Sequence, residues 1–534
     1  MKNSRRIIAG IIGLTVCTNM LLPVSAEDIA VPAADVQISG TDGASWEKLI
    51  NIDETEFPDE AFRSFVSENY DTDGDGLLLP SDLKKVTEMD VSNNGITSLD
   101  GIQYFIGLTS LNCSSNKLTY LDISQNTALV YLNCGYNTLM KLDLSKNAYL
   151  EELVCTNNSI NYLDLTENNA LKKLDCGYNK LLSLKVNEGI ERLSCGNNQL
   201  EELNVSDCTS LAYLNCENNT MYALYAAGAS SLTELRCNSN KLESLDISGD
   251  TALTYLNCND NNLDTLGLGT NTALKKIECS FNKIRILSIS GNTSVESLSC
   301  YKNELELLCA NGASSLKTLD CTWNSLREID LTGTSSLQRL DCSCNRLASI
   351  DINDSPLLTY INCNSNRFTS LDLSGRPDSL IAYCNYNEYD IGTVKNSYPL
   401  SELAAGFDPS KASDWHGAEY DPETNSLVNF TSRNVTYTYD LGNGKTANFS
   451  LVCELLKIKD ITVTDKNVIV TYSDYSTEEY SFDAVPSDIV NKMDISDAAA
   501  FVNAFSDTDG DMVLSDGQMK AIEMVLDSDY TALS

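Results

Sequence analysis

Residues 108–118 read LTSLNCSSNKL, and residues 253–263 read LTYLNCNDNNL. The shared pattern, LxxLxCxxNxL, recurs in register from Cys113 to Cys384. It supplies fourteen cysteines at intervals of 21 residues, apart from one interval of 19 between Cys176 and Cys195. An asparagine stands three residues after every one of these cysteines. A fixed period of this length predicts a solenoid in which each coil buries its leucines against the next coil.

Each half of the repeat predicts its own local structure. The LxLxC half favours a short parallel strand, and the asparagine is expected to turn inward and hydrogen-bond the backbone where the chain leaves that strand. The other half reads LDIS at residues 121–124 and LDLS at residues 371–374, which leaves little room for a helix. The convex side should therefore be strand-like or polyproline-like. An earlier coil, with Val91 in the cysteine column and Asn94 in the asparagine column, opens the array.

The repeat unit resembles the leucine-rich repeat, and the whole resembles secreted, internalin-like repeat proteins of Gram-positive bacteria. The resemblance covers roughly residues 86 to 390. It implies a leucine-rich repeat solenoid of the α/β class, a strongly β-rich horseshoe spanning residues 87–390. About 15 coils at ~4.8 Å per strand would give a curved rod roughly 70 Å long.

The chain has 19 cysteines, of which fourteen occupy the buried column of the repeat. Their side chains should point the same way in adjacent parallel strands, which is poor geometry for a disulfide. Buried thiols also pack as small hydrophobic groups. We therefore predict a reduced cysteine ladder rather than a disulfide framework or a metal site. Four cysteines outside the column could be exceptions: Cys208, Cys309, Cys344 and Cys453.

Residues 1–26 are typical of a secretory signal peptide. Lys2, Arg5 and Arg6 precede an apolar run, and the small residues 24–26 offer a cleavage site before Glu27. Residues 14–17 could instead be a lipoprotein acylation box, although Val16 is larger than such boxes normally accept before the cysteine. The prediction is a secreted, extracellular protein, with association with the cell surface as the alternative, in which residues 27–45 form a linker.

The composition argues against several classes of function. The chain has 75 acidic and 37 basic side chains and a formal net charge of −38, which repels nucleic acids and anionic lipid headgroups. Its single histidine, His416, excludes His-rich metal sites and makes a Ser-His-Asp or Cys-His mechanism improbable. No phosphate-binding loop, HExxH or GxSxG motif is present. We therefore expect no enzymatic activity and no catalytic residues.

Residues 71–82, DTDGDGLLLPSD, have the spacing of a calcium-binding EF-hand loop. Asp71, Asp73 and Asp75 stand at positions 1, 3 and 5, Leu77 would offer its carbonyl, and Asp82 would close the site at position 12. The preceding segment places apolar residues on one helical face, and a second helix should start at Ser81. Residues 46–86 are thus predicted to form a helical EF-hand-like cap that binds a structural calcium ion. An acidic turn without an ion is the alternative.

A weaker acidic loop lies near the C-terminus, at residues 507–518. Asp507, Asp509 and Asp511 keep the calcium spacing, and the carbonyl of Val513 and the side chain of Ser515 could add ligands. However, Met512 replaces the turn glycine and Gln518 the closing carboxylate. Residues 483–534 are predicted to form a helix-loop-helix, either an EF-hand-like end cap or a degenerate version of the dockerin module that it resembles, which would bind a cohesin.

Residues 391–482 lose the repeat and become β-rich. Two alternating segments flank Gly442-Asn443-Gly444, which predicts a hairpin, and a second hairpin is expected from residue 460 onward. An Ig-like or hairpin domain here would shield the last coil from edge pairing. Trp415 and His416 in this region are expected to pack rather than to react.

Side chains that flank each cysteine should face the concave surface, where they could contact a ligand. Nine of them are aromatic: Tyr131, Tyr136, Tyr178, Tyr213, Tyr255, Phe281, Tyr301, Trp323 and Tyr360. Amides accompany them at Asn112, Asn133, Asn215, Asn257 and Asn362. Rings among amides suit recognition of a protein or cell-surface partner. The alternatives are an accessory, dockerin-tethered component of a polysaccharide-degrading complex that contacts glycan or scaffold, and a solvated ladder without a ligand.

Overall fold

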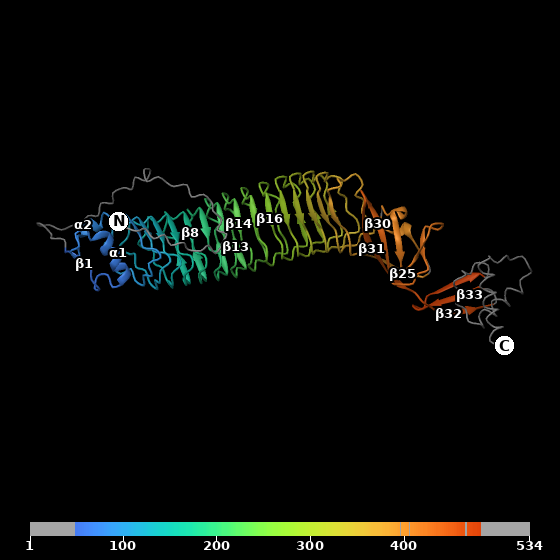
Figure 1. Cartoon of the computed structure of the whole chain (residues 1–534), viewed down its shortest axis with the longest axis horizontal. Helices are drawn as coiled ribbons and strands as arrows, with labels where there is room; N and C mark the ends of the chain where they lie inside the picture. Colours follow the sequence, from blue (N-terminus) through green and yellow to red (C-terminus); the bar gives the residue numbers. More distant parts are fainter. Residues whose placement is uncertain (1–47, 396, 405, 465–466, 482–534) are drawn as a thin grey trace, which may run out of the picture. The chain divides into compact units, whose positions relative to one another are not determined.

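The computed structural model describes residues 48–481 except 396, 405 and 465–466 (Figure 1). The predicted signal peptide and linker lie outside the described residues. So does the predicted C-terminal helix-loop-helix, together with its calcium ligands Asp507, Asp509, Asp511, Val513 and Ser515. Within the described part of the chain, no helix has the length and apolar character needed to cross a membrane.

The central part of the chain is a leucine-rich repeat solenoid, a β-solenoid of about 14 turns of roughly 21 residues. One parallel sheet of fifteen strands runs through the coils, and neighbouring strands pair without offset, as Leu132 does with Leu153. The strands are β3 (Glu88–Asp90), β4 (Ser110–Asn112), β5 (Tyr131–Asn133), β6 (Glu152–Val154), β8 (Lys173–Asp175), β10 (Arg192–Ser194), β12 (Tyr213–Asn215), β14 (Glu234–Arg236), β15 (Tyr255–Asn257), β16 (Lys276–Glu278), β18 (Ser297–Ser299), β20 (Thr318–Asp320), β22 (Arg339–Asp341), β23 (Tyr360–Asn362) and β24 (Ile381–Tyr383).

The opposite side of the coils is extended, as the short LDLS segments predict. Three small parallel sheets form there, and the one helical segment among the described coils is the 3₁₀ turn η1 (Ile102–Tyr104). The strands are β7 (Tyr162–Asp164) with β9 (Ser183–Lys185), β11 (Glu202–Asn204) with β13 (Ala223–Tyr225), and β17 (Ile286–Ser288) with β19 (Leu307–Cys309) and β21 (Ile329–Asp330). Because η1 is the only helical turn on this side of the described coils, each coil needs only about 21 residues.

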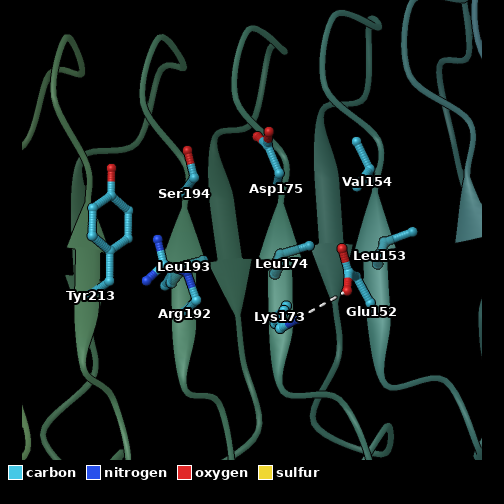
Figure 2. A pocket seen from close by; sticks show the side chains of 10 residues that line it. All are labelled: Glu152, Leu153, Val154, Lys173, Leu174, Asp175, Arg192, Leu193, Ser194 and Tyr213. Atoms are coloured by element: carbon cyan, nitrogen blue, oxygen red, sulfur yellow. Dashed lines mark hydrogen bonds and ion pairs between the residues drawn. The ribbon is translucent and has the colours of Figure 1, made fainter. Parts of the chain in front are cut away.

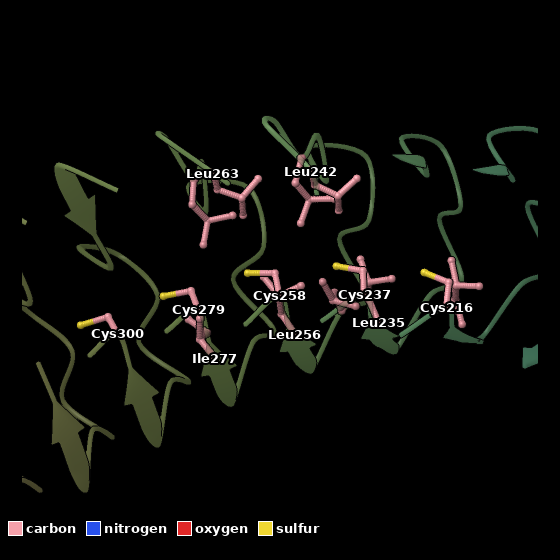
Figure 3. Close-up of a cluster of buried hydrophobic side chains, with 14 of the residues drawn as sticks. Cys216, Leu235, Cys237, Leu242, Leu256, Cys258, Leu263, Ile277, Cys279 and Cys300 are labelled. Carbon is pink, nitrogen blue, oxygen red and sulfur yellow. The ribbon is translucent and has the colours of Figure 1, made fainter. Parts of the chain in front are cut away.

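The column cysteines are buried among the leucines of the core. Figure 3 shows Cys216, Cys237 and Cys258 with their sulfur atoms directed the same way along the stack. All eighteen described cysteines are free thiols, including the four outside the column. Burial raises the pKa of Cys237 to about 12, and the Cys216 thiol donates to the carbonyl of Arg236 at 3.4 Å. Buried column cysteines such as Cys216 and Cys237 are therefore packing groups in the neutral form.

The asparagines of the repeat form the inward ladder that the sequence predicts, called here the first ladder. Asn261 shows the pattern: Oδ1 accepts from the N–H of Leu242 at 2.9 Å, and Nδ2 donates to the carbonyls of Cys237 and Cys258. In all fourteen coils Oδ1 accepts from a backbone N–H of the preceding coil. One side chain thus satisfies backbone groups of two coils at once.

The N-terminal cap consists of β1 (Ile50–Asn51), α1 (Glu60–Tyr70), β2 (Leu77–Leu78) and α2 (Pro80–Leu83). Helix α1 starts at the N-cap Asp59, whose carboxylate accepts from the N–H of Phe62, and it buries Phe62 and Val66. The other carboxylate oxygen of Asp59 accepts from the N–H and hydroxyl of Thr97, which connects the cap to the first coil. The helix expected from Ser81 is a single turn, because the chain enters β3 at Glu88.

After the last coil the chain forms β-structure that is antiparallel except for the parallel pairing of β25 with β31. The hairpin predicted around Gly442-Asn443-Gly444 is present between β30 and β31. The first sheet comprises β25 (Asn387–Val394), β31 (Lys445–Leu455), β30 (Asn434–Gly442) and β27 (Ala412–His416). Two further sheets contain β26 (Ser397–Pro399), β29 (Ser426–Val428) and β28 (Glu419–Asp421), and β32 (Ile458–Val463), β33 (Asn467–Tyr472) and β34 (Thr477–Ser481). The 3₁₀ turns η2 (Leu400–Glu402) and η3 (Pro409–Lys411) connect them.

This β-structure covers the end of the array through direct hydrogen bonds. The Tyr437 hydroxyl donates to the carbonyl of Thr369 at 2.6 Å, and the N–H of Leu373 donates to the carbonyl of Leu441 at 2.7 Å. Asn443, in the hairpin turn, donates to the carbonyl of Leu373. These bonds connect residues 369–373 of the last coils to the hairpin, whereas β24 remains the edge strand of the fifteen-stranded sheet. Nearby, Trp415 stacks on Tyr437 at 4.4 Å between ring centroids.

Candidate functional site

The candidate binding surface, called here the sheet face, consists of the first and third residues of the fifteen strands. These side chains point away from the core, whereas the middle residue of each strand is buried, except Ala382 of the last strand, β24, which is half-buried. It is the surface expected to be concave. The structure places four of the aromatic residues singled out above at first positions, half-buried by their neighbours: Tyr131, Tyr213, Tyr255 and Tyr360. The amides Asn112, Asn133, Asn215, Asn257 and Asn362 lie at third positions.

Basic side chains from adjacent coils stack on three of these rings. The guanidinium of Arg192 lies 4.4 Å from the ring centroid of Tyr213, and that of Arg339 lies 3.7 Å from that of Tyr360. The Tyr255 ring is flanked by Arg236 at 5.2 Å and Lys276 at 5.1 Å. The sequence analysis missed these cations, although Arg192 and Arg339 stand 21 residues before their rings, in the same column. Their stacking fixes the orientation of the rings.

Four of the other predicted aromatic residues lie in the loop directly after a strand, called here the rim. A rim residue is the second residue after a column residue, and all fifteen, from Asn93 to Tyr386, have left-handed backbone with φ between 51° and 59°. Tyr136, Tyr178, Phe281 and Trp323 occupy such positions. Tyr386 is a fifth rim ring that the sequence analysis missed, and its place two residues after Cys384 was the available signal.

The rim rings are exposed. Trp323 is 63 % exposed, Tyr386 79 % and Phe281, the least exposed, 41 %. The ninth predicted aromatic residue, Tyr301, lies beside the rim, with its ring edge-on to Phe281 at 4.9 Å. The ammonium of Lys302 lies 4.8 Å from the centroid of the same Phe281 ring. These contacts form one aromatic and basic cluster in the later coils.

A hollow of about 310 Å³ opens on the sheet face between β6 and β12 (Figure 2). On one side of the hollow, Lys173 of β8 and Glu152 of β6 form an ion pair of 3.2 Å. Tyr213 of β12 lies on the other side. Asp175 and the small residues Val154 and Ser194 line its other end. Burial raises the pKa of Asp175 and also that of Tyr213.

The predicted N-terminal calcium loop brings together part of its ligand set. Carboxylate oxygens of Asp71, Asp73 and Asp75 lie within 4.8 Å of one another, and no other such cluster of potential metal ligands occurs among the described residues. Asp71 accepts from the N–H of Gly74 at 2.9 Å and from that of Gly76 at 3.1 Å. Leu77 lies in β2, paired with Asn51.

Asp82 is not part of this carboxylate cluster. Its carboxylate accepts from the ammonium of Lys85 at 2.9 Å, on the exposed first turn after Pro80. The structure therefore brings together the ligands expected at positions 1, 3 and 5 but not the one expected at position 12. The physical reason is that the short helix α2 gives Asp82 a cation three residues away on the same turn.

Comparison with models of known protein families gives no match for this chain. Among curated proteins, internalin J of Listeria monocytogenes serotype 4b is 31% identical over 137 residues, which is 24% of this chain and 15% of that protein. Internalin J of serovar 1/2a is likewise 31% identical over 137 residues and is matched over 16% of its length. The chain therefore matches about a sixth of the length of these curated relatives.

Among solved structures, the functional domain of internalin J from Listeria monocytogenes is similar over 76% of this chain and 99% of that domain. The sequence identity is 26% and the TM-score 0.58. That domain is described as including a cysteine ladder, the feature predicted above for this chain. The chain is thus a leucine-rich repeat protein that is similar to internalin J in part of its sequence and to the functional domain of internalin J in its fold.

Proposed function

We propose that this protein is an exported, non-catalytic binding protein whose sheet face and rim recognise a protein or cell-surface partner. The observation that carries the proposal is the placement of five exposed aromatic rings on rim positions: Tyr136, Tyr178, Phe281, Trp323 and Tyr386. The left-handed backbone at these positions favours smaller residues such as asparagine. Aromatic residues there are therefore better explained by a binding role than by the stability of the fold.

Left-handed backbone disfavours bulky side chains, and Asn and Asp adopt it most readily among residues other than glycine. Eight of the other ten rim positions carry Asn, Asp or Ser, and the remaining two are Lys302 and Cys344. A ring at such a position adds strain of order 1 kcal/mol or more. It gains little burial in return, since Tyr136 and Tyr178 remain 59 % and 58 % exposed. Exposed rings that do not stabilise the fold typically serve an interface.

The proposal is tested with a panel of immobilised surface proteins and glycans probed with the whole protein. We expect a bound partner to be lost when Tyr136, Tyr178 and Trp323 are replaced together by asparagine, the residue that other coils use there. The matched control replaces three exposed residues of the convex strands by asparagine: Tyr162, Tyr225 and Ile286, which are 51 to 61 % exposed. Equal retention of the partner by both triple variants would exclude the rim as the binding surface.

We also propose that Asp71, Asp73 and Asp75 bind a structural calcium ion. Clustered carboxylates suit a hard cation that prefers oxygen ligands, and they repel one another without it. The N–H groups of Gly74 and Gly76 already orient Asp71. Because α1 and the first coil are connected through Asp59, the ion should stabilise the start of the array by about 2.7 kcal/mol at a hundredfold excess over Kd.

Hydrogen exchange of the whole protein tests the ion locally. Chelation should speed amide exchange in β1, β2 and α1 but not in the middle coils, and Asp73→Ala with Asp75→Ala should abolish that response. Asp507→Ala with Asp509→Ala is the control, since those residues belong to the separate C-terminal loop. Unchanged exchange in the cap on chelation would identify residues 71–75 as an ordinary acidic turn.

A further inference from the structure

A second hollow, of about 210 Å³, opens at the rim beside the one in Figure 2. Gly177 and Gly196 line it, each directly after a column cysteine. Glycine occupies this place in three of the fourteen coils, Gly135 being the third, and the remaining coils carry Ser, Thr, Asn, Glu or Tyr. None of the three glycines has a positive φ, so the backbone does not require them. At Gly177 and Gly196 the effect of the glycine is that no side chain fills the hollow.

The hollow contains a carboxylate that lacks the hydroxyl partner found elsewhere in its column. Asp320 and Asp341 occupy the same strand position as Asp175, and they accept from the hydroxyls of Thr322 at 2.8 Å and Ser343 at 2.7 Å. In the coil of Asp175 that residue is Gly177, which supplies only its N–H, at 3.1 Å. Among the described residues Asp175 therefore keeps one backbone donor and no side-chain donor.

The charges around Asp175 are also unbalanced. The hollow is lined by two carboxylates, Asp175 and Glu217, and by no Lys or Arg. The nearest basic residues of the adjoining hollow have other partners: Lys173 pairs with Glu152 at 3.2 Å, and Arg192 stacks on Tyr213 at 4.4 Å. Figure 2 shows Lys173 and Arg192 at the starts of β8 and β10, whereas Asp175 lies at the end of β8. Partial burial also raises the pKa of Asp175.

Two of the rim rings stand at this hollow. Tyr136 and Tyr178 line it from coils that are two periods apart, with Asn157 at the rim position between them. Strands two apart in a sheet are separated by ~9.6 Å, which leaves room for one flat group between or across the rings. Tyrosine faces attract cations, and a carboxylate beside them adds a charge-assisted hydrogen bond.

We propose that this hollow binds an arginine side chain of a partner protein, with Asp175 as the carboxylate that pairs with the guanidinium. Glu217 adds negative charge, and Tyr136 and Tyr178 supply ring faces for stacking. A guanidinium suits the site better than an ammonium because it is planar, weakly hydrated and able to donate two parallel hydrogen bonds. This proposal rests on the proposed function and names the chemical group that the rim and sheet face recognise.

The test uses the whole protein and ligand-detected NMR with the peptide acetyl-Gly-Arg-Gly-amide. We expect Asp175→Asn to weaken binding of the peptide at least tenfold. Gly177→Ser should also weaken it, because it restores a hydroxyl donor to the carboxylate and fills the floor of the hollow. Asp341→Asn is the matched control: it removes a carboxylate from the same column but outside the hollow, and it should leave binding unchanged. Hydrogen exchange of the coils between Cys155 and Cys216 checks that each variant is folded.

Replacing arginine by its uncharged isostere citrulline should abolish binding of the peptide, and methyl pyranosides should not compete with it. Equal binding of the citrulline peptide, competition by a pyranoside, or full binding by Asp175→Asn would each overturn the proposal. The peptide reports on the hollow alone, so its result is separate from the panel experiment. Loss of a panel partner in the rim variant without binding of the arginine peptide would refute only the arginine site. Peptide binding without any panel partner would refute the broader function.

Discussion

Two buried columns of polar residues run along the array, and they differ in how strictly the chain keeps them. The first ladder is asparagine in all fourteen coils. The second column, called here the second ladder, lies in the convex half of each coil. It contains Asn126, Asn147, Asn168, Asn187, Cys208, Ala229, Asp250, Asn271, Asn292, Ala313, Thr334 and Ser355, all nearly inaccessible to solvent. The second ladder is the more deeply buried of the two, since first-ladder asparagines such as Asn158 and Asn240 are only half-buried. Burial therefore does not explain why the second ladder is the one that tolerates exchange.

The hydrogen bonds explain it. In the second ladder Asn271 donates to the carbonyls of Ile247 and Asp250, each of which also accepts from a backbone N–H. Its Oδ1 has no partner, as is true for five of the six asparagines in this ladder. In the first ladder Oδ1 of Asn261 is the acceptor for the N–H of Leu242. An asparagine is indispensable where a buried N–H depends on it, and replaceable where it only adds a second donor to satisfied carbonyls.

The largest effect should come from removing a first-ladder asparagine. Asn261→Ala leaves the N–H of Leu242 buried without an acceptor and takes one donor from two cysteine carbonyls, so we expect a loss of about 3 to 4 kcal/mol. The matched change in the second ladder, Asn271→Ala, should cost about 1 kcal/mol because both carbonyls keep a backbone donor. Urea unfolding followed by circular dichroism measures both. Similar losses of unfolding free energy for the two variants would contradict the claim that the first ladder is less tolerant of substitution than the second.

A second-ladder change should increase stability. Asp250 is fully buried, and neither of its oxygens has a hydrogen-bond partner among the described residues. Burial raises its pKa from 3.8 to about 6, and the nearby N–H of Gly228, which does not reach hydrogen-bonding geometry with the carboxylate, opposes this rise only weakly. By the pattern of Asn271, an asparagine here would donate to the carbonyls of Ala226 and Ala229. Asp250→Asn should therefore stabilise the protein by roughly 2 to 3 kcal/mol at pH 7.

The pH dependence of this gain has a definite sign. The folded-state pKa of Asp250 lies above its usual value, so the ionised form destabilises the folded state. The penalty is absent below about pH 4, grows between pH 4 and 6, and is complete above pH 6. The advantage of Asp250→Asn in urea midpoint should grow over the same window. An advantage that is constant from pH 4 to 7 would mean that Asp250 does not change its protonation there.

The smallest effect should come from Cys208, which replaces asparagine in the second ladder. Its thiol is buried and lies 3.6 Å from the carbonyl of Asn187. Cys208→Ala removes one sulfur and a weak donor, so the expected loss is about 1 kcal/mol. Thiol labelling gives an independent measure, since buried neutral thiols should react only after urea unfolds the coil. A loss as large as that of Asn261→Ala would show that the second ladder is no more tolerant than the first.

The sequence alone contained most of what defines the solenoid. The period places one residue of each coil in each column, so the buried leucines, the neutral cysteines and the inward asparagines follow from one repeat and are all present. The same period identified Tyr136, Tyr178, Phe281 and Trp323, which the sequence analysis assigned to the concave face and which the structure places on the rim beside it; Tyr386 could have been identified in this way too. Because these positions recur at the same place in every coil, the sequence is enough to predict which side chains are buried and which are exposed.

Other features depend on how different coils meet in space, and only the tertiary structure decided them. Asp82 had the spacing of a calcium ligand, but its carboxylate pairs with Lys85. In the sequence, Asp175 does not differ from the many other acidic residues of the chain. In the structure, Gly177 gives it only a backbone N–H, whereas Asp320 and Asp341 also accept from a side-chain hydroxyl. Hydrogen bonds and desolvation act between atoms a few ångströms apart. The repeat determines which column a residue occupies. The contribution of its side chain to stability or binding depends on the particular neighbours that the stacking of coils brings into contact with it.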